Sequence, residues 1–426
     1  MNLFRKIGKK VKRFIRRHIK RDDYWTDLKE AIDYYNYKHG NSQRAFSFKL
    51  ICWIFLSMLR QYDSNRKKDL IIGKNIICNY KNPDSTFFNI GVYLIGDLKE
   101  YIMEANYINA FLKKYGSDSM KLDLFFHGET ELIDVLYRFD YVGQKLNASL
   151  KDIEKLKIDH KYDLYIVLDN YPRIKYKNLK KINELRPELL DYILVSEKYE
   201  MKNKRMMRYP QMIGQANILS ELEGKTFIQK LDIDQHLNIT SLDFPVSIQL
   251  DEEQYLSCNG LKEDNYIIIA TKSDFSNRKK VNNTDWITRY FEKLVPLLKG
   301  RLNDKKIVQL RFNEDKELDV DLSLLNVGVE QLMSLLKNAS LMICSEGGLV
   351  HLRQVLQGGK SVVIFGPNSP SYYGYKGNIN LRSDICQYPC EEITDKWKGR
   401  CMNASKKACM WALTPEMVIK ELDVYE

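Results

Sequence analysis

The chain has 426 residues, of which 44% are hydrophobic and 29% charged, a composition typical of globular proteins. This length is enough for two domains, each with its own core, and an extension. The formal net charge is +11, but ten Lys and Arg residues and no acidic residue lie in positions 1–21. The rest of the chain is therefore close to neutral, which argues against a general nucleic-acid-binding protein.

The N-terminal residues 1–86 are predicted to be a basic helical extension. In residues 1–21, apolar positions recur at helical spacing and basic residues fill the remaining positions. This pattern is typical of an amphipathic helix on an anionic membrane surface. The alternative is a solvated basic tail. The apolar run 50–59 is too short to span a bilayer, which takes about 20 residues, so it lies at the interface or packs under the first domain.

The compartment is inferred from the cysteines and the N-terminus. A secreted disulfide-rich protein would be shorter and denser in cysteine than this chain, which has eight. The basic N-terminus is not followed by the apolar stretch and cleavage site of a signal peptide. We therefore expect a cytoplasmic protein, attached peripherally to the inner face of the cytoplasmic membrane.

Residues 87–250 are expected to form a first α/β domain. Strand patterns cover 88–95, 121–126 and 163–169. Helical patterns cover 98–115, which ends at Gly116, and 129–139. Alternation of strands and helices predicts a parallel sheet covered on both faces.

Residues 251–426 repeat this pattern after a polar stretch at 240–258. Strands are predicted over 266–271, 306–311, 341–345 and 361–365, with helices over 284–298, capped by Thr284, and 330–339. The fold class is therefore α/β, with two Rossmann-like domains facing across a cleft. Ligands of such sheets bind at the carboxyl ends of the strands.

The strongest local motif is Ser345-Glu346-Gly347-Gly348-Leu-Val-His351, between a buried strand and an amphipathic segment. The two glycines let a ligand approach the backbone at a helix start, where free N–H groups favour phosphate. His351 would add a hydrogen bond or a positive charge. A second strand-to-loop turn follows at Gly366-Pro367. The alternative is that the glycines only permit tight turns and His351 is a core residue.

These two motifs resemble the donor site of glycosyltransferase family 9, the ADP-heptose:lipopolysaccharide heptosyltransferases. Glu346 stands where the family usually has Asp, and Gly347 where it has Ser or Thr. The segment Asn277-Arg-Lys279-Lys280 before Trp286 resembles the family's Lys-x-Trp segment. The resemblance covers about residues 88–424 and implies a GT-B fold and a nucleotide-diphosphate sugar donor such as ADP-heptose. Lys279 or Lys280 would pair with the diphosphate; otherwise they are solvated loop charges.

Asp97 follows the first predicted strand in the sequence Gly96-Asp97. In the family that this chain resembles, the Asp of a Gly-Asp pair at this position is the general base. A carboxylate at the tip of the strand would take a proton from an acceptor hydroxyl as its oxygen attacks the anomeric carbon. The alternative is that Asp97 only caps the following helix.

Four cysteines crowd the C-terminal part of the chain, at Cys386, Cys390, Cys401 and Cys409. Four thiolates can hold a tetrahedral Zn or Fe ion, which here would be structural. The resemblance points the same way, because some related autotransporter heptosyltransferases carry such an iron site. The alternatives are four reduced thiols or disulfides formed after isolation. No Asp-x-Asp motif accompanies the donor motif, so no catalytic divalent metal is expected.

The sequence as a whole therefore predicts an inverting glycosyltransferase that moves heptose or a related sugar onto a bacterial surface glycan, such as lipopolysaccharide or another polysaccharide. One alternative is a sugar-nucleotide epimerase, which uses the same two-domain fold. The other is an inactive, membrane-attached glycan-binding protein. No nucleic-acid partner is expected.

Overall fold

The computed structural model describes residues 80–128, 130–207, 213–272, 286–302, 304–313, 315–393, 401, 403 and 407–425. The chain divides into two compact units, Met1–Asn75 and Ile76–Glu426. The first unit lies outside the described residues, and so do the predicted amphipathic helix 1–21 and the apolar run 50–59. No helix in the described ranges is long and apolar enough to cross a membrane.

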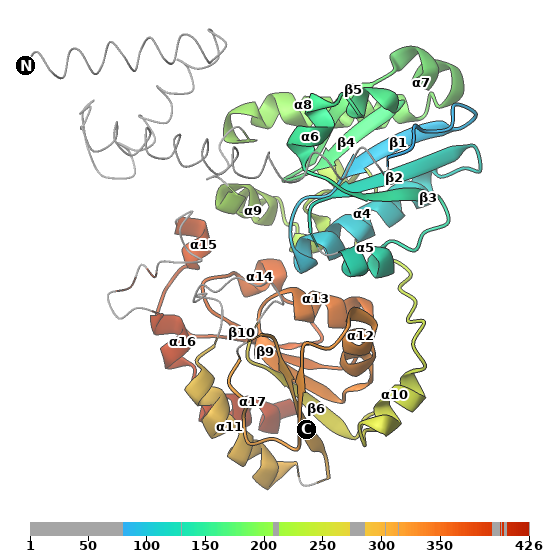
Figure 1. The fold of residues 1–426 in the computed structure, drawn as a ribbon. Helices are drawn as coiled ribbons and strands as arrows, with labels where there is room; N and C mark the ends of the chain where they lie inside the picture. Colours follow the sequence, from blue (N-terminus) through green and yellow to red (C-terminus); the bar gives the residue numbers. More distant parts are fainter. Residues whose placement is uncertain are drawn as a thin grey trace, which may run out of the picture. The chain divides into compact units, whose positions relative to one another are not determined.

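The first sheet has five strands in the order β3-β2-β1-β4-β5 (Figure 1). All neighbours are parallel except β4 and β5, which pair antiparallel. Its strands are β1 (Phe88–Tyr93), β2 (Met120–Phe126), β3 (Val142–Asn147), β4 (Leu164–Leu168) and β5 (Pro172–Lys177). Every residue of the central strands β1 and β4 is buried, as expected where helices cover both faces of a sheet.

Helices alternate with these strands, as predicted. Residues 98–115 form one helix, preceded by Asp97 as N-cap and followed by Gly116 as C-cap. The helices of this half are α4 (Leu98–Tyr115), α5 (Thr130–Leu136), α6 (Leu150–Lys155), α7 (Leu179–Leu185) and α8 (Leu189–Met207). Helix α9 (Ile213–Leu222) and the short 3-10 helices η3 (Phe227–Gln229) and η4 (Ile233–Gln235) follow.

The second sheet has six strands, all parallel, in the order β11-β10-β9-β6-β7-β8. Its strands are β6 (Tyr266–Ala270), β7 (Lys306–Arg311), β8 (Leu322–Leu325), β9 (Leu341–Ser345), β10 (Ser361–Phe365) and β11 (Ile379–Arg382). Its helices are α10 (Glu252–Cys258), α11 (Thr288–Arg301), α12 (Val329–Asn338), α13 (Gly348–Val355), α14 (Pro370–Tyr373), α15 (Cys390–Ile393), α16 (Ala408–Ala412) and α17 (Pro415–Tyr425). Helix α11 begins at Thr288, with Ile287 as N-cap, so the predicted start at Thr284 was wrong.

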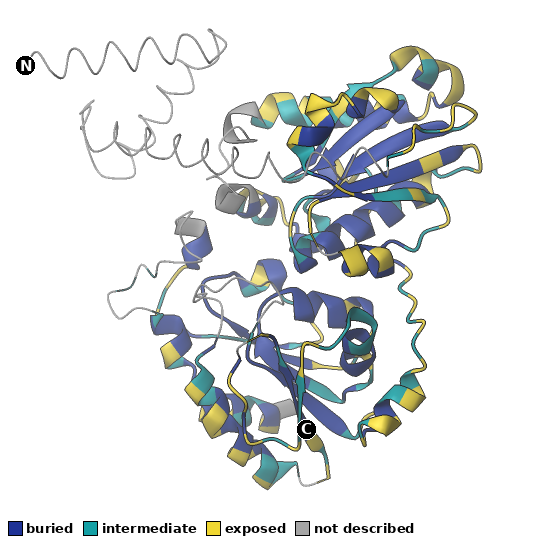
Figure 2. Ribbon diagram, in the orientation of Figure 1, coloured by how far each residue is buried: buried dark blue, intermediate teal, exposed yellow. Residues whose placement is uncertain are grey.

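The apolar core is continuous between the two halves of Ile76–Glu426. One cluster of buried side chains includes residues of β1 and α4 together with residues of β9, α12 and α13. A second cluster joins the opposite face of the second sheet to α11 and α17. Figure 2 shows the buried strands at the centre of each half and exposed residues on the outer helices.

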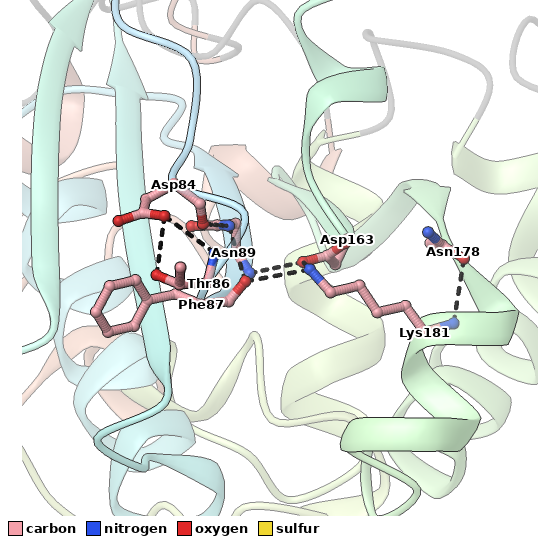
Figure 3. Close-up of polar contacts among 7 residues, drawn as sticks. All are labelled: Asp84, Thr86, Phe87, Asn89, Asp163, Asn178 and Lys181. Atoms are coloured by element: carbon pink, nitrogen blue, oxygen red, sulfur yellow. Dashed lines mark hydrogen bonds and ion pairs between the residues drawn. The ribbon is translucent and has the colours of Figure 1, made fainter.

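A polar network fixes the start of β1 to the start of β4 (Figure 3). Asp163 accepts a hydrogen bond from the backbone N–H of Asn89 at 2.8 Å and one from Lys181 Nζ at 2.8 Å. Lys181 Nζ also donates to the carbonyl oxygen of Phe87 at 3.2 Å. This lysine is therefore fully engaged in holding strands together, at the amino end of the sheet.

Candidate functional site

Both candidate loops leave their sheets at a topological switch point, where the strand order reverses. Gly96 and Asp97 follow β1. Strand β2 lies on one side of β1 in the sheet, and the chain later crosses to the other side to form β4. Ser345 and Glu346 close β9, which lies between β6 and β10. The carboxyl ends of parallel strands at such a point form the usual ligand position of this architecture.

The two loops meet through the N-terminal ends of α4 and α13, which contact each other. A Cβ on Gly348 would stand 2.6 Å from Leu98 Cδ2 and 2.8 Å from Leu98 Cβ. The missing side chain of Gly348 therefore makes room for Leu98 of the other half, whereas the sequence predicted room for a ligand. Gly347 is the N-cap of α13, in an extended conformation.

Glu346 lies at the centre of a buried group of ionisable side chains. Its Oε1 atom is 3.7 Å from Lys99 Nζ and 3.7 Å from His351 Nε2. All three residues are at most 9% exposed. Both distances are longer than a hydrogen bond, and neither Glu346 Oε1 nor His351 Nε2 has a hydrogen-bond partner within the described residues.

The charges of this group follow from burial and from its members' mutual contacts. Burial alone would raise the pKa of Glu346, but Lys99 and His351 outweigh it and hold that pKa below its ordinary value. Burial would lower the pKa of Lys99, but the carboxylates around it, Glu346 first, raise it above the ordinary lysine value. Burial lowers the pKa of His351. At neutral pH the group therefore holds a carboxylate, an ammonium and a neutral imidazole.

Aromatic rings hold His351 and Lys99 in place. His351 Nδ1 shares a 2.6 Å hydrogen bond with the Tyr375 hydroxyl, and its ring lies 5.2 Å from that of Phe227. Lys99 Nζ is 4.3 Å from the ring centroid of Tyr373 and 5.4 Å from that of Phe227, both within cation–π range. Sequence reasoning named none of these aromatic residues as part of the site, and Phe227 lies in no recognisable motif.

The other predicted donor residues lie around this group. Ser345 Oγ is fully buried and accepts a hydrogen bond from the backbone N–H of Trp286 at 2.8 Å. Gly366 is buried, and the Pro367 carbonyl accepts from the Glu391 backbone N–H at 3.1 Å. Lys279 and Lys280 lie outside the described residues, where their predicted contact with the diphosphate stays a prediction.

Asp97 is half-buried at the N-cap of α4, so the capping role that the sequence left open is present. Its backbone N–H donates to Glu100 Oε2 at 3.3 Å. Gly96 before it has a φ of +150°, and a Cβ there would stand 2.2 Å from Glu100 Cβ, so this turn requires glycine. Glycine thus permits the turn between β1 and α4 that places Asp97 at the N-cap.

Further carboxylates and a lysine surround the start of α4. Glu104 is fully buried; its Oε1 accepts from the Ile95 backbone N–H at 2.8 Å, and its Oε2 has no partner within the described residues. Burial raises the pKa of Glu104 well above the ordinary value. Lys230 Nζ donates to Asn170 Oδ1 at 3.0 Å, just after β4, and burial lowers its pKa.

Helix α9 is bonded to the second half by buried polar contacts. Glu391 Oε1 accepts hydrogen bonds from Asn217 Nδ2 at 2.7 Å and from the Tyr373 hydroxyl at 2.6 Å. Glu221 accepts from the hydroxyl of Ser369 at 2.8 Å. These bonds fix Tyr373 beside Lys99.

None of the four clustered cysteines forms a disulfide within the described residues. Burial raises the pKa of Cys409 to about 11, and the neighbouring Cys386, Cys390 and Cys401 contribute to this rise. Cys409 therefore lies within electrostatic reach of the other three thiols. Among the described residues, however, no three metal-binding side chains are close enough to hold an ion. The ligand chemistry suits Zn or Fe, but this geometry does not form a ready site.

Comparison with known proteins gives similarity at the level of structure. No protein-family model matches the chain, and no curated protein does. A glycosyl transferase family 9 protein from Veillonella parvula is 14% identical over 81% of this chain and 98% of its own, with a TM-score of 0.51. This chain has the GT-B fold of that protein.

Two further solved structures are similar with lower scores. ADP-heptose lipopolysaccharide heptosyltransferase II of E. coli is 16% identical over 79% of this chain and 98% of its own, with a TM-score of 0.47. The iron-containing dodecameric glycosyltransferase TibC of enterotoxigenic E. coli is 12% identical over 79% and 75%, with a TM-score of 0.49.

Proposed function

We propose that this GT-B chain is an inverting glycosyltransferase, which moves heptose or a related sugar from a nucleotide diphosphate to a bacterial surface glycan. The observation that carries the proposal is the meeting of two loops at the N-terminal ends of α4 and α13. One loop bears the half-buried carboxylate of Asp97, and the other bears Glu346 and leads to His351 in α13; Glu346 Oε1 and His351 Nε2 have no hydrogen-bond partner within the described residues. Unpartnered buried polar atoms are costly in a protein that binds nothing there.

In the proposed reaction, Asp97 takes the proton of an acceptor hydroxyl while that oxygen attacks the anomeric carbon of the donor. The bond from this carbon to the diphosphate breaks, and its electron pair leaves with the diphosphate oxygen. Attack from the side opposite the leaving group inverts the anomeric configuration. Free N–H groups at the start of α13 and the imidazole of His351 would stabilise the charge on the diphosphate.

The proposal includes two features outside this reaction. Residues 1–21 would hold the protein on the inner face of the cytoplasmic membrane, beside lipid-linked acceptors. A structural Zn or Fe would be held by four thiolates, those of Cys386, Cys390, Cys401 and Cys409. To bind an ion, the sulfurs would have to come closer together than they are in the described residues. We derive no step of the reaction from this metal.

The test is a panel of ADP-, GDP-, UDP- and CDP-linked sugars, incubated with the protein and with a lipopolysaccharide or polysaccharide extract. A glycosyltransferase releases the nucleoside diphosphate with one of these donors and labels the glycan. Product that appears without acceptor, as an epimerised nucleotide sugar, would instead support an epimerase. Binding of the glycan with no turnover of any donor would support the inactive glycan-binding protein.

A further inference from the structure

Lys99 belongs to the first α/β half, but its ammonium group lies in the donor motif of the second. It stands in the first turn of α4, two residues after Asp97. Its Nζ atom is 3.7 Å from Glu346 Oε1 and is flanked by the rings of Tyr373 and Phe227. The side chain is only 11% exposed. Helix α4 therefore brings a positive charge and the proposed base to the same place.

The contacts of Lys99 differ from those of a lysine that stabilises the fold. Lys181 donates two hydrogen bonds of 2.8 and 3.2 Å at the other end of the same sheet (Figure 3). Lys99 Nζ makes no hydrogen bond within the described residues; it has the 3.7 Å ion pair, the two rings and the longer-range attraction of further carboxylates. A buried ammonium group retains three N–H donors that need acceptors.

The groups that face Lys99 are also incompletely bonded. Glu346 is 3% exposed and His351 is 1% exposed, and their atoms Oε1 and Nε2 have no hydrogen-bond partner within the described residues. The Nε2 atom and Lys99 Nζ are each 3.7 Å from the same carboxylate oxygen. Three buried polar groups thus converge at distances longer than a hydrogen bond, at the N-terminal turn of α13, whose N-cap Gly347 provides no side-chain cap.

We propose that Lys99 binds the diphosphate of the nucleotide-sugar donor, so that the acceptor-side half supplies the cation that neutralises the leaving group. The inference rests on the proposed function. The imidazole of His351 is neutral, because its burial disfavours the charged form, so it does not supply this charge. An ammonium group that lacks hydrogen-bond acceptors is the matching partner for phosphate oxygens, and the start of α13 favours the same ligand.

This assignment couples the two halves of the reaction. Donor binding at the second half would hold the N-terminal turn of α4 through Lys99. The carboxylate of Asp97, on the same turn, would thereby be fixed relative to the anomeric carbon. When no donor is bound, the carboxylate of Glu346 balances the charge of Lys99, as the diphosphate would when the donor is bound.

The test compares nucleoside diphosphates with monophosphates, because only the former extend to the sugar-proximal phosphate. Calorimetry measures how each nucleotide binds to the full chain. The diphosphates are ADP, GDP and UDP, and the matching monophosphates are AMP, GMP and UMP. Lys99→Met should lower the affinity for the best-binding nucleoside diphosphate by about 10- to 100-fold, the usual contribution of a charge-assisted hydrogen bond. The affinity for the matching monophosphate should change by less than about twofold. Lys181→Met removes a half-buried lysine at the other end of the same sheet and should leave both affinities unchanged.

A second pair of variants separates ligand binding from charge compensation. If Lys99 only neutralises Glu346, the double variant Lys99→Met/Glu346→Gln should regain the diphosphate preference; if Lys99 binds the ligand, it should not. The double variant also contains no unpaired buried charge from this pair, so it remains informative where Lys99→Met alone fails to fold. An unchanged preference in folded Lys99→Met would overturn this inference alone. A wild-type chain that binds none of the three diphosphates, and turns over no ADP-, GDP-, UDP- or CDP-linked sugar, would overturn the proposed function as well.

Discussion

Gly348 of α13 lies against Leu98 of α4, so closely that a Cβ on the glycine would stand 2.8 Å from Leu98 Cβ. The two helices belong to different halves of Ile76–Glu426, and each follows a candidate loop of its sheet. Leu98 is buried, with 2% of its surface exposed. The contact therefore fixes the distance between Asp97 and the donor motif.

Gly348→Ala should destabilise the fold by about 1–3 kcal/mol, the usual cost of overpacking a core. The free energy of unfolding is measured by urea titration. Gly300→Ala is the matched control, because Gly300 lies in α11 with nothing within 4 Å of its added Cβ. Alanine there should leave stability unchanged or raise it, by up to about 1 kcal/mol. Equal stabilities of the two variants would contradict the close contact.

Asp97→Asn should reduce glycosyl transfer by about 100-fold or more, because the amide cannot accept the acceptor proton. Asparagine is as good an N-cap as aspartate, so the melting temperature should stay the same. Initial rates of nucleoside diphosphate release are measured at saturating donor. If the asparagine variant turns over at the wild-type rate, Asp97 is a cap and not the base.

Glu104 should make stability depend on pH in a defined direction. Its folded-state pKa lies above the unfolded value, so the folded chain binds an extra proton between the two values. The stability that the protonated group contributes is present below the unfolded pKa of about 4.3 and is lost as pH rises toward the folded pKa. Glu104→Gln keeps the acceptor for the Ile95 N–H and carries no charge.

The glutamine variant should therefore match the wild type near pH 4 and exceed it increasingly at higher pH, by up to about 1.4 kcal/mol per pH unit. Urea unfolding from pH 4 to 8 measures this difference. The exposed Glu317, which pairs with Arg311 at 2.7 Å, provides a control. Its change to glutamine should show no such rise. A constant difference between the Glu104→Gln variant and the wild type would show that Glu104 is ionised in the fold.

The parts of the fold that were predicted to the residue are those with strong local signals. The helix 98–115 has a cap at each end, and the strands 341–345 and 361–365 are nearly uniform apolar runs. Strands at or near the sheet edges were missed, because their residues are partly exposed and the apolar pattern is weak. These are β3, β5, β8 and β11.

The candidate site, too, has residues that a local signal predicted and residues that it did not. Asp97, Glu346 and His351 were found from their loops, each of which follows a buried strand. Lys99 was missed, since a lysine in the first turn of a helix looks like any solvated charge. Its partner lies in the other half of the chain, and no local pattern indicates a contact between residues so far apart. The contact between Gly348 and Leu98 was missed for the same reason.

The cysteine cluster gives a prediction about the metal content of the purified protein. Protein prepared without added metal should contain about one Zn or Fe per chain if the four thiolates bind it. Elemental analysis measures this, and Cys409→Ser should remove most of the metal because it removes one of the four proposed thiolate ligands. Cys258→Ser, at an exposed cysteine elsewhere, serves as control. A metal content near zero in active protein would leave four reduced thiols.

The basic N-terminal residues give the last prediction. Each Lys or Arg near an anionic leaflet contributes about 1 kcal/mol, so ten of them within residues 1–21 are enough for reversible attachment. Removing residues 1–21 should release the protein from vesicles containing anionic lipid, in a flotation assay at physiological salt. Binding of the full chain should also weaken as salt rises, since screening acts on exposed charges. The truncated chain should bind the nucleoside diphosphate as before, because Glu346 and His351 lie in the second half. A full chain that ignores anionic vesicles would show that these charges serve another partner.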